Sequence, residues 1–91
     1  MTPEQLRTRM ASISRSQATN ATYTIIDRLQ HMPAHEQIVA AAMVFWRLCN
    51  VAGIRPNDCL EICNNLFADG FKPAPEFRAT DKYLQHVFNQ G

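Results

Sequence analysis

The sequence has little glycine, almost no net charge and no long hydrophobic run. Its 91 residues include three glycines and carry a formal net charge of +1, although 46% of them are hydrophobic. Nucleic-acid binding usually needs a basic excess, so the near-neutral charge does not favour that class. The longest uncharged apolar run, Ile38–Trp46, has nine residues, whereas a membrane-spanning helix needs about 20. We therefore expect a protein without a membrane span.

Cysteine is also sparse. Cys49, Cys59 and Cys63 are an odd number, and no two of them form a Cys-x-x-Cys pair. A secreted domain held together by disulfides normally has an even and denser set. The first residues lack the apolar stretch of a signal peptide. These features predict a reduced, cytoplasmic protein.

What the sequence does contain is helical periodicity. Apolar residues recur every three or four positions, and β-branched residues do not alternate with polar ones as they do in strands. The length suits one domain, since about 100–200 residues per domain is usual. The pattern predicts a single compact all-α domain over residues 1–91, with four or five helices.

The N-terminal segment, residues 2–32, is predicted to be helical and to begin at a capping box. Thr2 is suited to the N-cap, Pro3 to the first helical position and Gln5 to the reciprocal bond. The residues that follow Ile13 are rich in Ser, Thr and Asn, which compete for backbone hydrogen bonds. A break near residues 14–20 is therefore predicted, and residues 14–22 fit either a helix or a loop.

The rest of the chain divides into a helical hairpin and a tail. Residues 33–69 are predicted to form the hairpin, which turns at Gly53 because glycine readily ends a helix in the left-handed conformation. Two prolines favour an extended link over residues 70–79. A short helix over residues 80–89 should complete the domain.

The first helix of the hairpin, at about residues 34–52, is apolar on nearly every side. From Ile38 to Cys49 only Arg47 is polar, and a helix that is hydrophobic all round belongs in the centre of a fold. We expect this helix to be central. Its bulky residues are predicted to form the core or a dimer interface: Ile38, Met43, Phe45 and Trp46. A chain this small has difficulty covering such a helix, which predicts a homodimer.

A second predicted surface is the aromatic tail. Aromatic residues, methionine and arginine are enriched at the centres of protein interfaces. The residues predicted to bind a partner protein are Phe71, Phe77, Tyr83 and Phe88 in the tail, and Arg7 and Arg9 in the first helix. The leading hypothesis is a small non-enzymatic protein-binding protein, of the modulator or inhibitor type, which acts by occluding its partner.

The alternative hypothesis is a nucleic-acid-binding transcriptional regulator. The hairpin around Gly53 resembles a helix-turn-helix in its spacing, and Arg7, Arg9 and Arg15 make the N-terminal segment basic. However, the helix that would read bases carries Asp58 and Glu61 and no lysine or arginine. Carboxylates repel the phosphate backbone, which makes nucleic-acid binding the less favoured hypothesis.

Metal binding and catalysis receive less support. Cys59 and Cys63 lie four residues apart, as do His31 and His35, and together they could be a zinc ligand set. Buried core cysteines are the favoured explanation of the first pair. No phosphate-binding loop, carboxylate cluster or activated thiol is evident. We therefore assign no catalytic, cofactor-binding or metal-ligating residue and predict that the protein is not an enzyme.

Overall fold

Helices make up most of the chain in this computed structural model, which describes residues 1–70 and 72–89. The helices in these residues are α1 (Pro3–Ala11), α2 (Arg15–Leu29), α3 (Ala34–Ala52), α4 (Pro56–Phe67) and α5 (Pro75–Asn89). Two short strands, β1 (Ala68–Asp69) and β2 (Lys72–Pro73), pair antiparallel between α4 and α5. The predicted single all-α domain is therefore confirmed.

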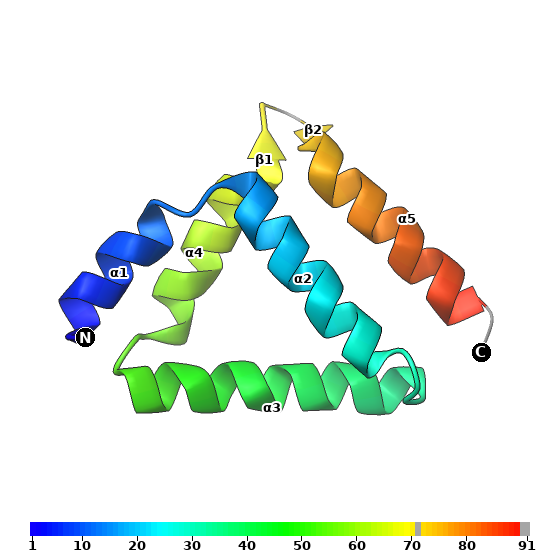
Figure 1. Cartoon of the computed structure of the whole chain (residues 1–91), viewed down its shortest axis with the longest axis horizontal. Coiled ribbons are helices and arrows are strands. Elements are labelled where there is room, and N and C mark those ends of the chain that lie inside the picture. Colours follow the sequence, from blue (N-terminus) through cyan, green and yellow to red (C-terminus); the bar gives the residue numbers. More distant parts are fainter. Residues whose placement is uncertain (71, 90–91) are drawn as a thin grey trace.

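The helices are arranged as a triangle (Figure 1). Helix α3 forms its base, and α2 and α4 rise from the two ends of α3 and converge near the top. Helix α1 lies outside α4, and α5 lies outside α2. The molecule measures 41 × 31 × 19 Å along its principal axes, so it is broad and flat.

Two capping boxes begin α1 and α2. The Thr2 hydroxyl accepts from the Gln5 backbone N–H at 3.2 Å, and the Gln5 side chain accepts from the Thr2 N–H, which confirms the predicted start of α1. Ser14 and Gln17 form the same pair at the start of α2. The predicted break near residues 14–20 is therefore placed too late in the sequence. The break in the helix lies between the end of α1 and the start of α2.

The hydroxyl-rich stretch is helical because its side chains bond within the helix. Thr19, Thr22 and Thr24 each donate to the carbonyl four residues earlier, at distances of 2.7–3.0 Å. These bonds satisfy the hydroxyls without displacing a backbone hydrogen bond of the helix. The residues that we expected to interrupt the helix therefore continue it.

The tail also differs from the prediction. Helix α5 begins at Pro75 rather than near residue 80, so the extended link over residues 70–79 is too long. Proline suits the first helical position because its fixed φ is already helical and the missing N–H has no partner there. The Ala74 carbonyl accepts from the backbone N–H groups of Phe77 and Arg78, at 3.0 and 3.1 Å, and closes the first turn.

The core is small and does not surround α3. The buried hydrophobic residues are Ile26, Cys49, Ile54 and Ala74. Among the described residues, no large side chain is completely buried. The expectation that α3 is central is wrong: Ile38, Met43 and Trp46 are exposed, and Phe45 is only half-buried. Helix α3 lies at the edge of the triangle, where its neighbours reach it mainly at its two ends (Figure 1).

None of the described helices is by itself long and apolar enough to cross a bilayer. Helices α3 and α4 reach the necessary length and hydropathy only as a joined pair, and the helix axis bends by 116° between them.

Candidate protein-binding surface

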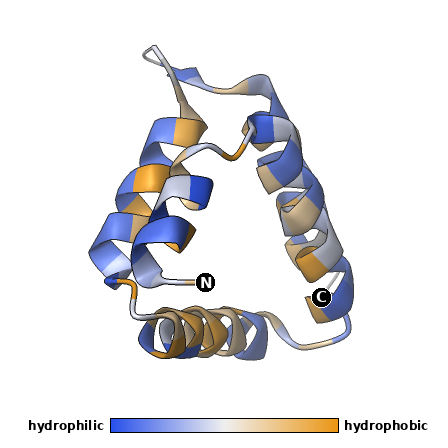
Figure 2. Cartoon of the chain, turned by 60° about the vertical axis from the view of Figure 1, so that its left-hand side comes forward, coloured by the Kyte–Doolittle hydropathy of each residue, from blue (hydrophilic) through white to orange (hydrophobic). Residues whose placement is uncertain are grey.

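The most unusual feature of the molecule is the exposed apolar surface of α3, which we call the α3 surface. Figure 2 shows hydrophobic residues along this helix where no other helix covers it. The exposed fractions range from 51% for Trp46 to 81% for Val51. The residues of the α3 surface are Ile38, Val39, Met43, Val44, Trp46, Leu48 and Val51. Exposed apolar residues are ordinary when scattered singly, but a contiguous group indicates an interaction site.

The two ends of α3 fix its position at the edge of the fold. At the first end, the buried Gln37 side chain donates to the Met32 carbonyl at 2.7 Å and holds the turn from α2. At the other end, Gly53 has a φ of 73°, and the Ile54 N–H donates to the Cys49 carbonyl at 2.9 Å. The Ile54–Cys49 bond beside a left-handed glycine is typical of a Schellman motif, which gives the last carbonyls of the helix hydrogen-bond partners. The left-handed glycine that the sequence predicted is therefore confirmed.

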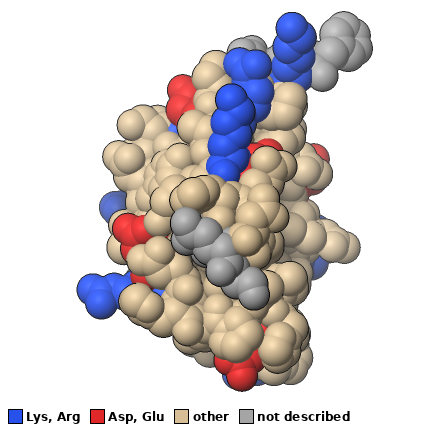
Figure 3. Space-filling model, turned by 90° about the vertical axis from the view of Figure 1, so that its right-hand side faces the viewer, with Lys and Arg blue, Asp and Glu red and all other residues tan. Residues whose placement is uncertain are grey.

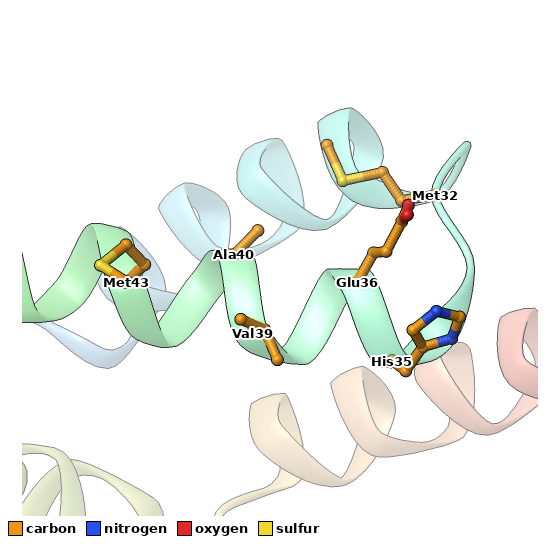
Figure 4. Close-up of a pocket in the computed structure, with 6 residues that line it drawn as sticks. All are labelled: Met32, His35, Glu36, Val39, Ala40 and Met43. Carbon is orange, nitrogen blue, oxygen red and sulfur yellow. The ribbon is translucent and has the colours of Figure 1, made fainter.

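A shallow groove runs along the first half of α3. Its volume is about 560 Å³, and it is open to the surface. Figure 4 shows Glu36 and Ala40 on the same side of α3 as Met32, with Val39 pointing to the other side and Met43 further along the helix. The groove is lined by Met32, His35, Glu36, Val39, Ala40 and Met43. Its lining is mostly apolar, with one carboxylate and one imidazole at the end nearest α2.

Two of the predicted partner-binding residues make contacts inside the molecule. The Phe77 ring packs against Phe67 with ring centroids 5.7 Å apart, so it fastens α5 to α4. The Tyr83 hydroxyl donates to Asp27 at 3.0 Å, and its ring meets Tyr23 edge-on at 5.6 Å. The hydrogen bond to Asp27 is the main cause that raises the pKa of Tyr83. Both aromatic residues thus join helices within the chain.

The other predicted partner-binding residues are dispersed. Phe88 is exposed near the end of α5, and Phe71 lies outside the described residues. Arg7 and Arg9 are on α1, at the opposite side of the triangle from α5 (Figure 1). Arg7 forms an ion pair with Asp58 at 3.9 Å, while Arg9 is exposed beside an open hollow. The five of these residues that the structure describes therefore do not form one surface.

Helix α5 and the strand before it carry a group of exposed basic side chains. Figure 3 shows lysine and arginine gathered toward the upper end of this face. Lys72, Arg78 and Lys82 are exposed, and the last two lie one turn apart on α5. These three residues were not among those predicted to bind a partner, although the spacing of Arg78 and Lys82 on one helical face is evident from the sequence.

The corner at Gly53 has the angle of a helix-turn-helix but not its charge. The axis bends by 116° between α3 and α4, within the range of about 90–120° for that motif. Asp58 lies at the corner and forms ion pairs with two arginines, with Arg7 at 3.9 Å and with Arg55 at 3.3 Å. The exposed residues of α4 include Glu61 and no lysine or arginine. This face is therefore poorly suited to a phosphate backbone.

The three cysteines come together where α3 meets α4. Cys49 is buried, Cys59 is half-buried and Cys63 is exposed, and all three are free thiols. The pKa of Cys59 is raised to about 11, mainly by burial and further by the neighbouring thiols of Cys63 and Cys49. A thiol with a raised pKa is mostly protonated at neutral pH and is a weak nucleophile. The sequence did not reveal this cluster, because Cys49 belongs to a different helix.

The four residues that were considered as a zinc ligand set, and not assigned as one, do not come together. His31 and His35 are at the corner between α2 and α3, whereas Cys59 and Cys63 are on α4. Over residues 1–70 and 72–89, no group of three or more His, Cys, Asp or Glu side chains has a geometry that could hold a metal ion.

Comparison of the chain with known protein families, curated proteins and solved structures gave no match.

Proposed function

We propose that this chain is a small non-enzymatic protein-binding protein that works as a homodimer and acts by occluding the surface of a partner protein. One observation carries the proposal: the α3 surface, in which seven large apolar side chains lie uncovered around one helix. An apolar area of this kind is unfavourable in water and becomes favourable when another polypeptide covers it.

The accessible area supports a large interface. The chain exposes 6978 Å², whereas a compact protein of its mass exposes about 5,400 Å². The difference of about 1,600 Å² is about twice the roughly 800 Å² that each partner buries in a standard interface, and for two chains it amounts to about 3,200 Å², within the range of obligate dimers. The radius of gyration of 14.1 Å, against an expected value of about 12 Å, agrees with an open shape.

The groups that could perform chemistry favour a binding role over catalysis. The cysteine with a clearly shifted pKa, Cys59, is shifted away from reactivity. The hollow between α2, α4 and α5 has a volume of about 240 Å³ and is lined mainly by apolar residues such as Leu66 and Phe77. Catalytic pockets instead bring together polar groups with perturbed pKa values.

The surface that we assign to the partner protein is the outer face of α5. Arg78 and Lys82 are exposed there, and Phe88 adds an exposed aromatic ring near the end of the same helix. Exposed basic side chains favour an acidic protein surface, and aromatic residues are enriched at interface centres. The three free cysteines fit the reducing cytoplasm, which we propose as the compartment.

The experiment compares two double variants in affinity capture from cell extract. Arg78→Glu/Lys82→Glu changes the outer face of α5, and Met43→Glu/Val44→Glu changes the α3 surface. We expect the α5 variant to keep the wild-type molar mass and lose its partner, because acidic groups repel the proposed acidic surface. We expect the α3 variant to become monomeric. Capture of the same partner by the α5 variant would contradict the assignment of α5, and an unchanged mass for the α3 variant would contradict the dimer.

Nucleic-acid binding is the second candidate, and the 116° bend at Gly53 is the observation that favours it. Real phosphate contacts make affinity fall steeply as salt rises. A titration of random duplex DNA in low salt tests this candidate directly. Tight binding with a steep salt dependence supports it, and the absence of binding at low salt removes it.

A further inference from the structure

The side of α3 that faces away from the core carries a regular seam. Phe45 and Cys49 are half-buried and buried and mark the inner side of the helix. Four residues on the opposite side of the helix follow one another at spacings of four, three and four positions. The seam residues are Glu36, Ala40, Met43 and Arg47, of which Ala40 is half-buried and the other three are exposed. This is the spacing by which one helix packs along another in a coiled coil.

The charges of the seam are complementary to those of a second copy. Glu36 and Arg47 are the only Asp, Glu, Lys or Arg residues of α3, and they have opposite signs. They lie eleven residues apart, which places them on nearly the same face and about 16 Å from one another along the helix. Within the described part of the chain neither forms an ion pair, and Arg47 instead lies over the Trp46 ring at 5.2 Å from its centroid.

Only one relative direction of two α3 helices satisfies these charges. In an antiparallel pair with its two-fold axis between residues 41 and 42, each Glu36 is opposite the partner's Arg47, so two ion pairs form. A parallel pair places Glu36 opposite Glu36 and Arg47 opposite Arg47, which is unfavourable in a desolvated interface. The charge pattern therefore selects the antiparallel arrangement.

The sizes of the seam residues fit the same register. Met43 is then opposite the partner's Ala40, whose small side chain lies in the groove beside α3 (Figure 4). Val39 and Trp46 flank the seam on one side, so the Trp46 ring of each copy meets the partner's Val39. A large side chain opposite a small one allows close helix packing, and tryptophan and methionine are favoured at interface centres.

From this complementarity we infer that the occupant of the α3 seam is a second copy of this chain, packed antiparallel with Glu36–Arg47 ion pairs at both ends. The inference rests on the homodimer in the proposed function and specifies its register. The excess accessible area described above is of the size that a second copy covers. An isologous interface pairs each patch with its own copy, so it needs a self-complementary pattern such as Glu36 opposite Arg47.

Charge reversal tests the register. The variants are Glu36→Arg, Arg47→Glu and the double variant, studied by sedimentation equilibrium in low salt. Each single reversal replaces both ion pairs with like-charge contacts, so its dimer should dissociate about tenfold more readily. The double variant restores both pairs and should return to within about threefold of the wild type. An equimolar mixture of the two single variants should form a mixed dimer more tightly than either forms alone.

Matched controls carry the same charge changes on α5. Glu76→Arg and Lys82→Glu change the net charge as the two single variants do and should dimerise like the wild type. Far-UV circular dichroism verifies that each variant is folded. A dimer that ignores all three α3 variants, or single variants that the double variant does not rescue, overturns the antiparallel register while the homodimer stands. A monomeric wild-type protein overturns the homodimer itself, and the register with it.

Discussion

The α2–α5 side of the molecule and the α3 side differ in how their apolar residues are covered. On the α2–α5 side, polar and aromatic contacts accompany burial: Tyr83 bonds Asp27, and Ile26 and Thr80 are buried. On the α3 side, a 19-residue helix buries only Gln37 and Cys49. The first side covers most of its large apolar residues within one chain, and the second does not.

The difference follows from the distribution of apolar residues around each helix. A helix with one apolar face, such as α5, needs one neighbour to cover it. Helix α3 carries apolar residues on every side, and a chain of 91 residues has too few other helices to surround it. The exposed surface of α3 is therefore a consequence of the sequence, and a second chain resolves it.

The largest expected effect comes from breaking the open side. Met43→Glu places a carboxylate in the centre of the seam, where it would be buried without a partner. We expect the dissociation constant of the dimer to rise at least 100-fold, which corresponds to about 2.7 kcal/mol. Sedimentation equilibrium measures it. Phe88→Glu puts the same charge on an exposed residue of α5 and should leave the constant unchanged; equal effects of the two variants would contradict the account.

Packing within the chain is tested at Arg15, whose side chain connects α2 to the end of α4 by hydrogen bonds. Its Nε donates to the Leu66 carbonyl at 2.9 Å, and its Nη2 donates to the Ala68 carbonyl at 2.8 Å. Arg15→Met keeps most of the length of the side chain and removes both bonds, so we expect the free energy of unfolding to fall by about 2 kcal/mol. Urea unfolding at one fixed protein concentration measures the loss. Arg9→Met, on exposed α1, is the control, and an equal loss in both variants would refute the role of Arg15.

The corner between the two sides depends on Gly53. Its φ of 73° is unfavourable for alanine, and an added Cβ would lie 3.2 Å from the Pro3 Cγ. We expect Gly53→Ala to cost about 1–2 kcal/mol in unfolding free energy from the left-handed backbone alone. Gly70 has a similar φ of 66° with no atom within 4 Å. Gly70→Ala should therefore cost less than Gly53→Ala, and thermal unfolding of the two variants distinguishes the contact with Pro3 from the backbone strain.

The smallest effect concerns the thiols at the same corner. With a pKa of about 11, Cys59 has little thiolate at pH 8, so iodoacetamide should modify exposed Cys63 first and Cys59 much later. Mass spectrometry of timed samples gives the order. Because the thiol ionises more readily in the unfolded chain, its contribution to stability is complete below pH 9 and is lost as the pH rises toward about 11. Faster modification of Cys59 than of Cys63 would be inconsistent with this structure.

Local signals in the sequence predicted the elements well. The capping box at Thr2, the left-handed Gly53 and the helix starting at Pro56 are each determined by a few neighbouring residues. The start of α5 was harder to predict, because Pro75 fits both an extended link and the first turn of a helix. Its actual role depends on the bonds to the Ala74 carbonyl, which the sequence does not display.

The candidate site could be predicted only in part. The apolar block of α3 is evident in the sequence, and so is the expectation that a small chain cannot cover it. Which α3 residues are exposed depends on where α2 and α4 meet the helix, and that is a property of the whole fold. The contacts of Phe77 and Tyr83 within the chain likewise depend on the placement of α5.

The molar mass of the wild-type protein in solution tests the central claim most directly. Sedimentation equilibrium over a range of micromolar concentrations should give twice the chain mass of 10.4 kDa, because each copy covers the α3 seam of the other. A mass of 10.4 kDa at every concentration would show that α3 remains uncovered by a second copy and would contradict the account.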